Sequence, residues 1–142
     1  MTAYTSTTSG NFNAAATWGG GGYPSADGDT FTIANGHTVT YNITTALSTG
    51  LGTGTINAGG KLSFASTSRM RVNGDINVSG TFEMLSNSQL YFRGTGRQLY
   101  FPGTTCALNL VGSDGTPTTT LSSAVTTKNS ILPVASSSSF AV

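Results

Sequence analysis

The sequence predicts an all-β fold, a short parallel β-solenoid with coils of about 20 residues, at the short end of the periods typical of repeat architectures. Residues 56–64 (INAGGKLSF) are echoed by residues 76–84 (INVSGTFEM), and the echo continues to residue 94. An earlier copy lies at residues 32–41, at a slightly longer offset. In all three copies, small Gly-bearing corners separate short alternating strands. A fixed period of this kind is typical of a solenoid, whose coils bury their apolar faces against neighbouring coils.

The sequence divides into an N-terminal arm and a β-helical domain. Residues 1–17 contain Thr, Ser, Asn and Ala without periodicity, so we expect an irregular N-terminal arm. A β-helical domain over residues 18–142 follows, and it opens with a capping loop at residues 18–30. The aromatic residues of this loop, which also contains four consecutive glycines, are expected to cover the open end of the stack. The domain ends in a weakly patterned tail at residues 118–142.

The strands begin at Thr30, where apolar residues alternate with threonines on both sides of Asn35-Gly36. Alternation of this kind predicts half-buried strands. An Asn-Gly pair between two alternating runs is also a strong hairpin signal, so an antiparallel hairpin is the alternative for this segment.

Stacking the coils by the 20-residue repeat predicts the solenoid interior. It places apolar residues on apolar residues, as a filled interior requires. The expected pairs are Ile56 on Ile76, Leu62 on Phe82, Phe64 on Met84, Met70 on Leu90 and Val72 on Phe92. At the corners and between the columns, the same stacking places Gly60 over Gly80, Gly74 over Gly94, Asn57 over Asn77 and Ser68 over Ser88.

The composition excludes several classes of function. Only 8% of the residues are charged and the formal net charge is +1, so no bulk charge favours nucleic acid or an anionic membrane surface as a partner. The single Cys106 rules out an internal disulfide. The first residues lack the basic start and apolar run of a signal peptide, so we expect assembly in a cytoplasm.

Residues capable of catalysis are few, and we expect no enzymatic activity and no cofactor or metal. Asp27-Gly28-Asp29 is expected to form a turn, because a calcium site needs more oxygen ligands than this segment offers. His37 is the only histidine and falls at a turn, which excludes a cage of histidines. Cys106 is expected to be a small buried apolar residue.

One group of residues stands out as a candidate contact surface. Arg69, Arg71, Tyr91 and Arg93 fall on the outward positions of their predicted strands, with Arg71 beside Tyr91 and Arg93 beside Asn73. Arg and Tyr are enriched at protein interfaces, and Arg also binds anionic groups, although a solvated face with cation–π packing is an equal alternative. Together with Tyr4 and Thr5 of the arm, these four residues are the candidate partner-binding set.

Two segments carry a resemblance to known proteins: residues 17–24 (TWGGGGYP) and residues 28–40 (GDTFTIANGHTVT). They resemble the opening of right-handed parallel β-helix structural proteins of bacteriophage virions and bacterial surfaces, and are also similar to a glycine-rich β-helical domain of some extracellular eukaryotic proteins. The resemblance covers roughly residues 17–42, with the general coil pattern to about residue 95. It implies a right-handed coil and a structural role, since the acidic clefts of polysaccharide-cleaving members are missing here.

These observations together lead us to expect a virion protein, foremost a capsid decoration (cement) protein that bridges major capsid subunits as a homotrimer. The arm would drape over neighbouring subunits. A receptor- or glycan-binding module of a tail fibre, tail spike or surface adhesin is the alternative, with the basic and aromatic residues contacting sugar.

Overall fold

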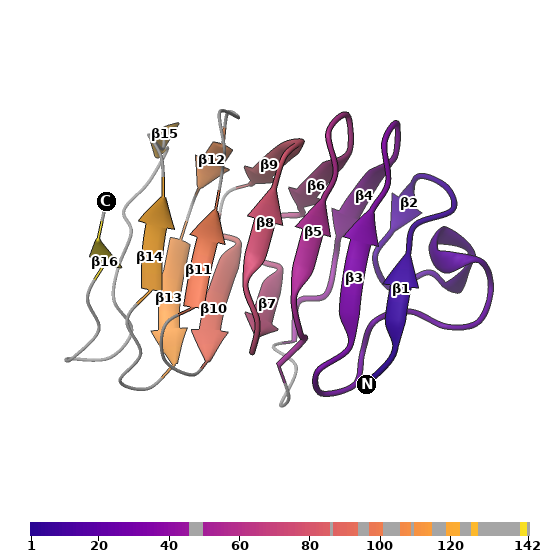
Figure 1. The fold of residues 1–142 in the computed structure, drawn as a ribbon, viewed down its shortest axis with the longest axis horizontal. Coiled ribbons are helices and arrows are strands. Elements are labelled where there is room, and N and C mark those ends of the chain that lie inside the picture. Colours follow the sequence, from indigo (N-terminus) through magenta and orange to yellow (C-terminus); the bar gives the residue numbers. More distant parts are fainter. Residues whose placement is uncertain are drawn as a thin grey trace.

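The chain folds as a parallel β-solenoid, shown by a computed structural model (Figure 1). The structure describes residues 1–45, 50–85, 87–93, 97–100, 106–108, 110–114, 119–122, 126–127 and 140–141, with side chains for the first three ranges and for Leu99 and Tyr100. Three parallel sheets form the sides of the rod. Among the described residues, the first coils alternate between two of these sheets, and the third sheet begins at Arg69. A 3-10 helix, η1 (Ala15–Trp18), precedes the second coil.

Sheet A forms the front of the rod in Figure 1 and holds seven strands among the described residues. In spatial order they are β1 (Ala3–Thr5), β3 (Thr30–Ile33), β5 (Gly54–Ile56), β8 (Ile76–Val78), β11 (Arg97–Tyr100), β14 (Thr119–Ser122) and β16 (Phe140–Ala141).

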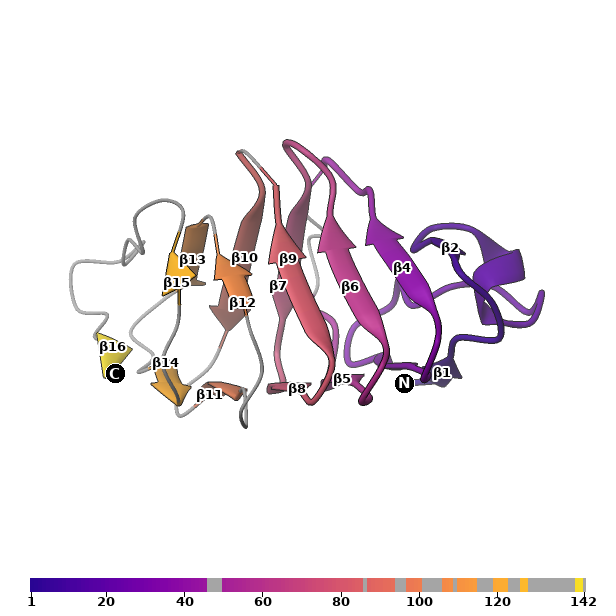
Figure 2. The same ribbon diagram turned by 90° about the horizontal axis from the view of Figure 1, so that it is seen from above.

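Sheets B and C form the other two sides, which separate clearly when the rod is seen from above (Figure 2). Sheet B consists of β2 (Gly10–Asn11), β4 (Thr38–Tyr41), β6 (Lys61–Phe64), β9 (Thr81–Met84), β12 (Cys106–Leu108) and β15 (Thr126–Thr127). Sheet C consists of β7 (Arg69–Val72), β10 (Gln89–Arg93) and β13 (Leu110–Asp114).

Every strand pair in the described part of the chain is parallel, which excludes the hairpin alternative at Asn35-Gly36. β3 belongs to sheet A and β4 to sheet B, so the turn between them is a corner of the coil. Gly36 sits in this corner with φ of 79°, and its N–H donates to the Gly59 carbonyl of the next coil. The interstrand bonds that a hairpin would use within one coil are therefore made to the following coil.

The interior is apolar because every strand turns alternate residues inward. Four of the five predicted columns are confirmed: Leu62 pairs with Phe82, Phe64 with Met84, Met70 with Leu90 and Val72 with Phe92. All eight side chains are essentially inaccessible to solvent. Burying one such side chain contributes roughly 1.5–3 kcal/mol, so these columns are a large part of what holds the coils together.

The fifth predicted column is wrong by two residues. Ile56 pairs with Val78 in sheet A, and Ile76 pairs with Gly54. The corner from sheet A to sheet B is two residues shorter in the later coil: five residues separate Ile56 from Leu62, and three separate Val78 from Phe82. Asn77 accordingly lies beside Thr55, not beside Asn57. Coils are on average about 23 residues apart, and the 20-residue spacing is confined to the β6–β9 and β7–β10 pairs.

The corner between sheets B and C does keep the predicted spacing. Ser68 and Ser88 are both fully buried there, and each hydroxyl donates to a carbonyl three residues earlier, of Ala65 and Leu85. The preceding residues, Thr67 and Asn87, both adopt a left-handed backbone. The two serines occupy equivalent positions as predicted, and each one closes its own turn. The companion prediction for Gly74 and Gly94 lies outside the described residues.

The segment predicted as an irregular arm is irregular for most of its length, yet it is tied to the stack. β1 pairs with β3 and β2 pairs with β4, so residues 1–17 form the first coil. Phe12 is fully buried and contacts Trp18, Phe31 and Tyr41, with ring centroids 5.1, 5.3 and 4.9 Å apart. Composition alone misses this coil because its anchors are the single residues Ser6 and Phe12, not a periodic pattern.

Trp18 closes the N-terminal end of the interior. Its indole is 7% exposed and donates from Nε1 to the Phe12 carbonyl at 2.7 Å. Tyr4 packs edge-on against it, with a centroid distance of 6.3 Å. Tyr4 and Phe12, which precede the predicted capping loop, thus belong to the same aromatic cluster as Trp18.

Candidate functional site

The predicted basic and aromatic residues gather on the outer face of sheet C. Arg71 of β7 pairs directly with Tyr91 of β10, as expected, and Arg69 pairs with Gln89. Directly paired residues on adjacent strands lie about 5 Å apart, close enough for their side chains to interact. We call Arg69, Arg71, Gln89, Tyr91 and Arg93 the basic face.

Exposure and contacts differ within the basic face. Arg69 is exposed, whereas Arg71, Tyr91 and Arg93 are half-buried. The Tyr91 hydroxyl donates to Oε1 of Gln89 at 2.7 Å, which holds the phenol along the strand. Arg71 and Arg93 each have a further interaction of their own. The face therefore combines one exposed arginine, Arg69, with half-buried neighbours.

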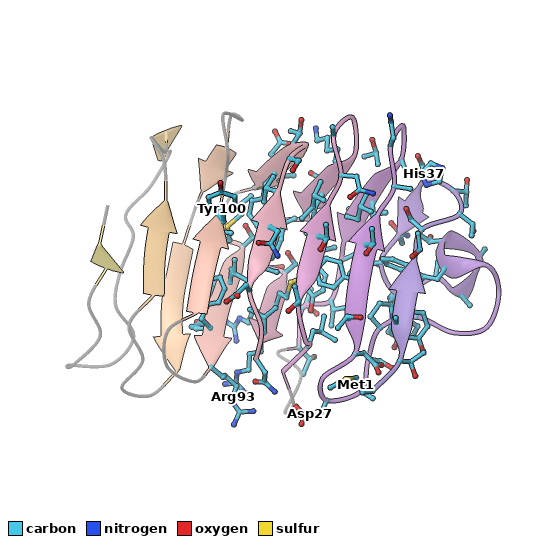
Figure 3. All side chains as sticks on the ribbon, viewed as in Figure 1. Met1, Asp27, His37, Arg93 and Tyr100 are labelled. Carbon is cyan, nitrogen blue, oxygen red and sulfur yellow. The ribbon has the colours of Figure 1, made fainter. Side chains whose placement is uncertain are left out.

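Arg93 lies at the edge of the basic face, at the lower side of the rod in Figure 3. β10 pairs with β7 as far as Phe92 and Val72, so Arg93 and Asn73 both follow directly on that pair. The Asn73 amide donates to Asp27 Oδ1 at 2.7 Å and to the Gly50 carbonyl at 3.2 Å. On its other side, Arg93 pairs in register with Asp114 of β13.

The interior supports the basic face through Tyr41. This tyrosine is fully buried, and its hydroxyl donates to the backbone carbonyl of Arg69 at 2.9 Å. Burial, together with the neighbouring Tyr23, raises the pKa of the Tyr41 phenol, so it stays protonated and remains a donor. The first residue of β7 is thereby anchored from inside the solenoid.

Tyr4 and Thr5, the other two predicted contact residues, do not join the basic face. They lie in β1 on sheet A. Tyr4 is half-buried against Trp18, so most of its ring belongs to the N-terminal cover. Thr5 is exposed and pairs with Thr32.

Asp29, an ionisable residue outside the basic face, has a structural role. Asp29 is 2% exposed, and its carboxylate accepts the backbone N–H groups of Thr2, Ser25 and Ala26 at 2.6, 3.2 and 2.9 Å. Burial alone raises the pKa of this carboxyl, but the three N–H donors and the N-terminal ammonium stabilise the anion more strongly. The net result is a pKa below the usual 3.8, and Asp29 acts as a turn residue as predicted.

His37 ties the first coil to the second. Its Nδ1 lies 2.9 Å from the hydroxyl of the buried Ser6, which accepts the Ala34 N–H at the same distance. Because Ser6 already accepts that amide, its own hydrogen is available to Nδ1, and the pair closes a corner. This agrees with the predicted turn role of His37.

Sheet B carries a different outer surface. Lys61 Nζ and Glu83 Oε2 form an ion pair at 2.9 Å, and the Ser63 hydroxyl donates to the same carboxylate oxygen at 3.2 Å. The side chains are 38% and 29% exposed, and pairs of this kind are worth about 0.2–1 kcal/mol.

Sequence reasoning missed a polar row on sheet A. Its register aligns Thr5, Thr32, Thr55, Asn77 and Tyr100 across five neighbouring strands. The outward polar residues can be recognised in the sequence. The sequence separation between paired members differs from coil to coil, however, so stacking by a fixed 20-residue repeat does not align them.

The part of the chain that the structure describes holds neither a metal site nor a membrane-spanning helix. No three His, Cys, Asp or Glu residues cluster there, and no helix there has the length and hydropathy to cross a bilayer. The side chain of Cys106 lies outside the described residues. No protein-family model, curated protein or solved structure matches this chain.

Proposed function

We propose that this protein is a structural component of a bacteriophage virion, a capsid decoration protein that binds by surface contact and catalyses no reaction. The observation that supports this proposal best is the basic face, because arginine and tyrosine are the residue types that anchor protein interfaces. The strands that carry this face are fixed by a packed interior, so little order must be gained when a partner binds. The resemblance of residues 17–42 to phage β-helix proteins adds support.

In this proposal, the basic face meets an acidic patch on the major capsid protein. The arginines give orientation and bidentate hydrogen bonds to carboxylates. A homotrimer seated at a threefold position would present three such faces, so modest individual contacts would act together. Draping of residues 1–17 over the capsid is left out of the proposal, because that segment pairs with its own β3 and β4.

The first test is the copy number of the chain in purified phage particles. Quantitative mass spectrometry should find it in a fixed ratio to the major capsid protein, at tens to hundreds of copies per particle. A few copies would indicate a tail component, and absence from particles would reject a virion role.

The second test is the basic face itself. Replacing Arg69 and Arg93 by glutamine should reduce capsid occupancy about tenfold or more, because charged interface hydrogen bonds are worth roughly 1.5–3 kcal/mol each. The matched control is Lys61→Gln on sheet B, which removes one cation from another face. Equal losses in both proteins would mean that overall charge, not the basic face, controls binding.

The second candidate function is an adhesin or tail module that binds a glycan, and Tyr91 beside Arg71 favours it. A planar ring next to a guanidinium suits an anionic sugar. A glycan array with Tyr91→Ala and Arg93→Ala proteins distinguishes the two functions. Specific binding that both substitutions abolish would favour the glycan-binding module. An array without bound glycans would favour the capsid decoration protein.

A further inference from the structure

The outer face of sheet A carries a straight row of uncharged polar side chains. Thr5, Thr32, Thr55, Asn77 and Tyr100 occupy paired positions on β1, β3, β5, β8 and β11. Neighbouring strands are about 4.8 Å apart, so the row repeats at that interval across the front of the rod. The five strands lie side by side in Figure 1, and Figure 3 shows Tyr100 at the upper end of β11.

The polar groups of this row are not used by the protein. Among the described residues, none of the four hydroxyls and the amide forms a hydrogen bond with another protein group. In contrast, Ser63 on sheet B and Tyr91 on sheet C both donate to a side chain of their own sheet. The row therefore offers unoccupied donors and acceptors at regular intervals.

The row also differs from the other two faces in charge. Sheet B carries the Lys61–Glu83 ion pair and sheet C carries three arginines, whereas the row consists of Thr, Asn and Tyr side chains. Asp75 lies two residues before Asn77 and already has an interaction of its own. The five side chains of the row carry no charge that would attract an ionic group, so the row itself complements a neutral ligand. The side chain of Arg97, at the start of β11, lies outside the described residues.

We infer that the row on sheet A binds a neutral polysaccharide that lies along the rod and crosses the strands. Hydroxyl groups both donate and accept, so a repeating line of them matches a polymer that presents hydroxyls at regular intervals. Tyr100 is 42% exposed at one end of the row and offers an aromatic ring to the apolar face of a sugar. This inference goes beyond the proposed function, which depends on sheet C.

The ligand must be a polymer because each contact is weak. A hydrogen bond that replaces two bonds to water contributes little by itself, so a single sugar would not be retained. Five contacts along one rigid row act together, and the ordering cost on the protein side is small because the backbone is held by the strand pairs.

The test is retention of the purified chain on insoluble cellulose and chitin, together with its retardation in native gels containing a neutral soluble β-glucan. The wild-type chain should bind at least one of these three probes. Thr32→Val with Thr55→Val keeps the branched shape and removes two hydroxyls, and it should weaken binding roughly tenfold, since two ordinary hydrogen bonds are lost. Tyr100→Ala should weaken it further.

The matched control is Thr40→Val on sheet B, which is the same substitution at a half-buried outward position. It should leave binding unchanged, and thermal unfolding should show all variants folded. Loss of binding in the control, unchanged binding in the sheet A variant, or no retention on any neutral probe would each overturn the inference. Binding only to anionic polymers would also overturn it, and would point to the basic face. None of these outcomes bears on capsid occupancy, which the Arg69 and Arg93 variants measure.

Discussion

At the scale of single residues, the N-terminal coil depends on a few buried side chains. Phe12 joins the cover of the stack to its interior by touching three aromatic rings, and Ser6 and Asp29 bind the first coil through backbone amides. None of the three belongs to a periodic pattern. Their importance follows from position alone.

We expect Phe12→Ala to lower the free energy of unfolding by about 3–5 kcal/mol, because a large cavity opens among packed rings. Urea unfolding followed by circular dichroism measures this. The matched control is Tyr100→Ala, since that ring is exposed and its loss should change stability by no more than about 0.5 kcal/mol. Equal effects of the two substitutions would contradict the proposed aromatic cover.

Because of Asp29, we expect the stability of the first coil to depend on pH in the acid range. Its pKa is lower in the folded than in the unfolded chain, so its carboxylate stabilises the fold above the unfolded value of 3.8, and this stabilisation is lost as the pH falls through the folded value. We expect Asp29→Asn to cost about 1–3 kcal/mol at pH 7, because buried amides lose an anionic acceptor. The difference between the two proteins should shrink below pH 3.8. If the free energies of unfolding of the wild-type and Asp29→Asn proteins differed by the same amount from neutral pH to the acid range, this role of Asp29 would be refuted.

At the scale of strands and corners, sheet A has a glycine in its interior column. Gly54 sits between Phe31 and Ile76 in the interior column, and a Cβ at this position would enter the space of both side chains. The missing side chain is what allows the Phe31 ring and the Ile76 side chain to share one column.

Gly54→Ala should therefore destabilise the fold by about 1–3 kcal/mol through overpacking. Gly21→Ala is the control, because a Cβ there meets nothing within 4 Å and its φ is not positive. Thermal unfolding of both proteins gives the comparison. A neutral Gly54→Ala would mean that the column has unfilled space.

Much of the fold could be predicted from sequence, because alternation and Gly corners report directly on a solenoid. The register in sheet A could not. A corner that shortens by two residues keeps every inward residue inward, so Ile56 over Ile76 and Ile56 over Val78 satisfy the same apolar pattern. The basic face was predictable since it lies on β7 and β10, which do keep the predicted spacing. The sheet A row was not, because it spans the unequal coils.

At the scale of the whole molecule, each coil packs mainly on its neighbours, so stability should be transmitted along the rod from coil to coil. The N-terminal cover is then a local element of the stack. A destabilising substitution at one end should therefore lower the stability of the nearest coils most and that of distant coils least.

Hydrogen exchange can measure this transmission. In Phe12→Ala, amides of β1 to β4 should lose protection first, while amides of β8 and β9 should keep most of theirs. Uniform loss of protection along the described strands would show that the rod unfolds as a single unit.

The three-sided cross-section has a consequence for how the protein can be used. Sheets A and C are different sides of one stiff body, so a polymer along one side does not cover the arginines on the other. Under the two proposals made above, one copy would hold two unlike partners at the same time without competition between them. Such a molecule would be an adaptor between a particle and a carbohydrate coat, and each attachment could vary by substitutions on its own side.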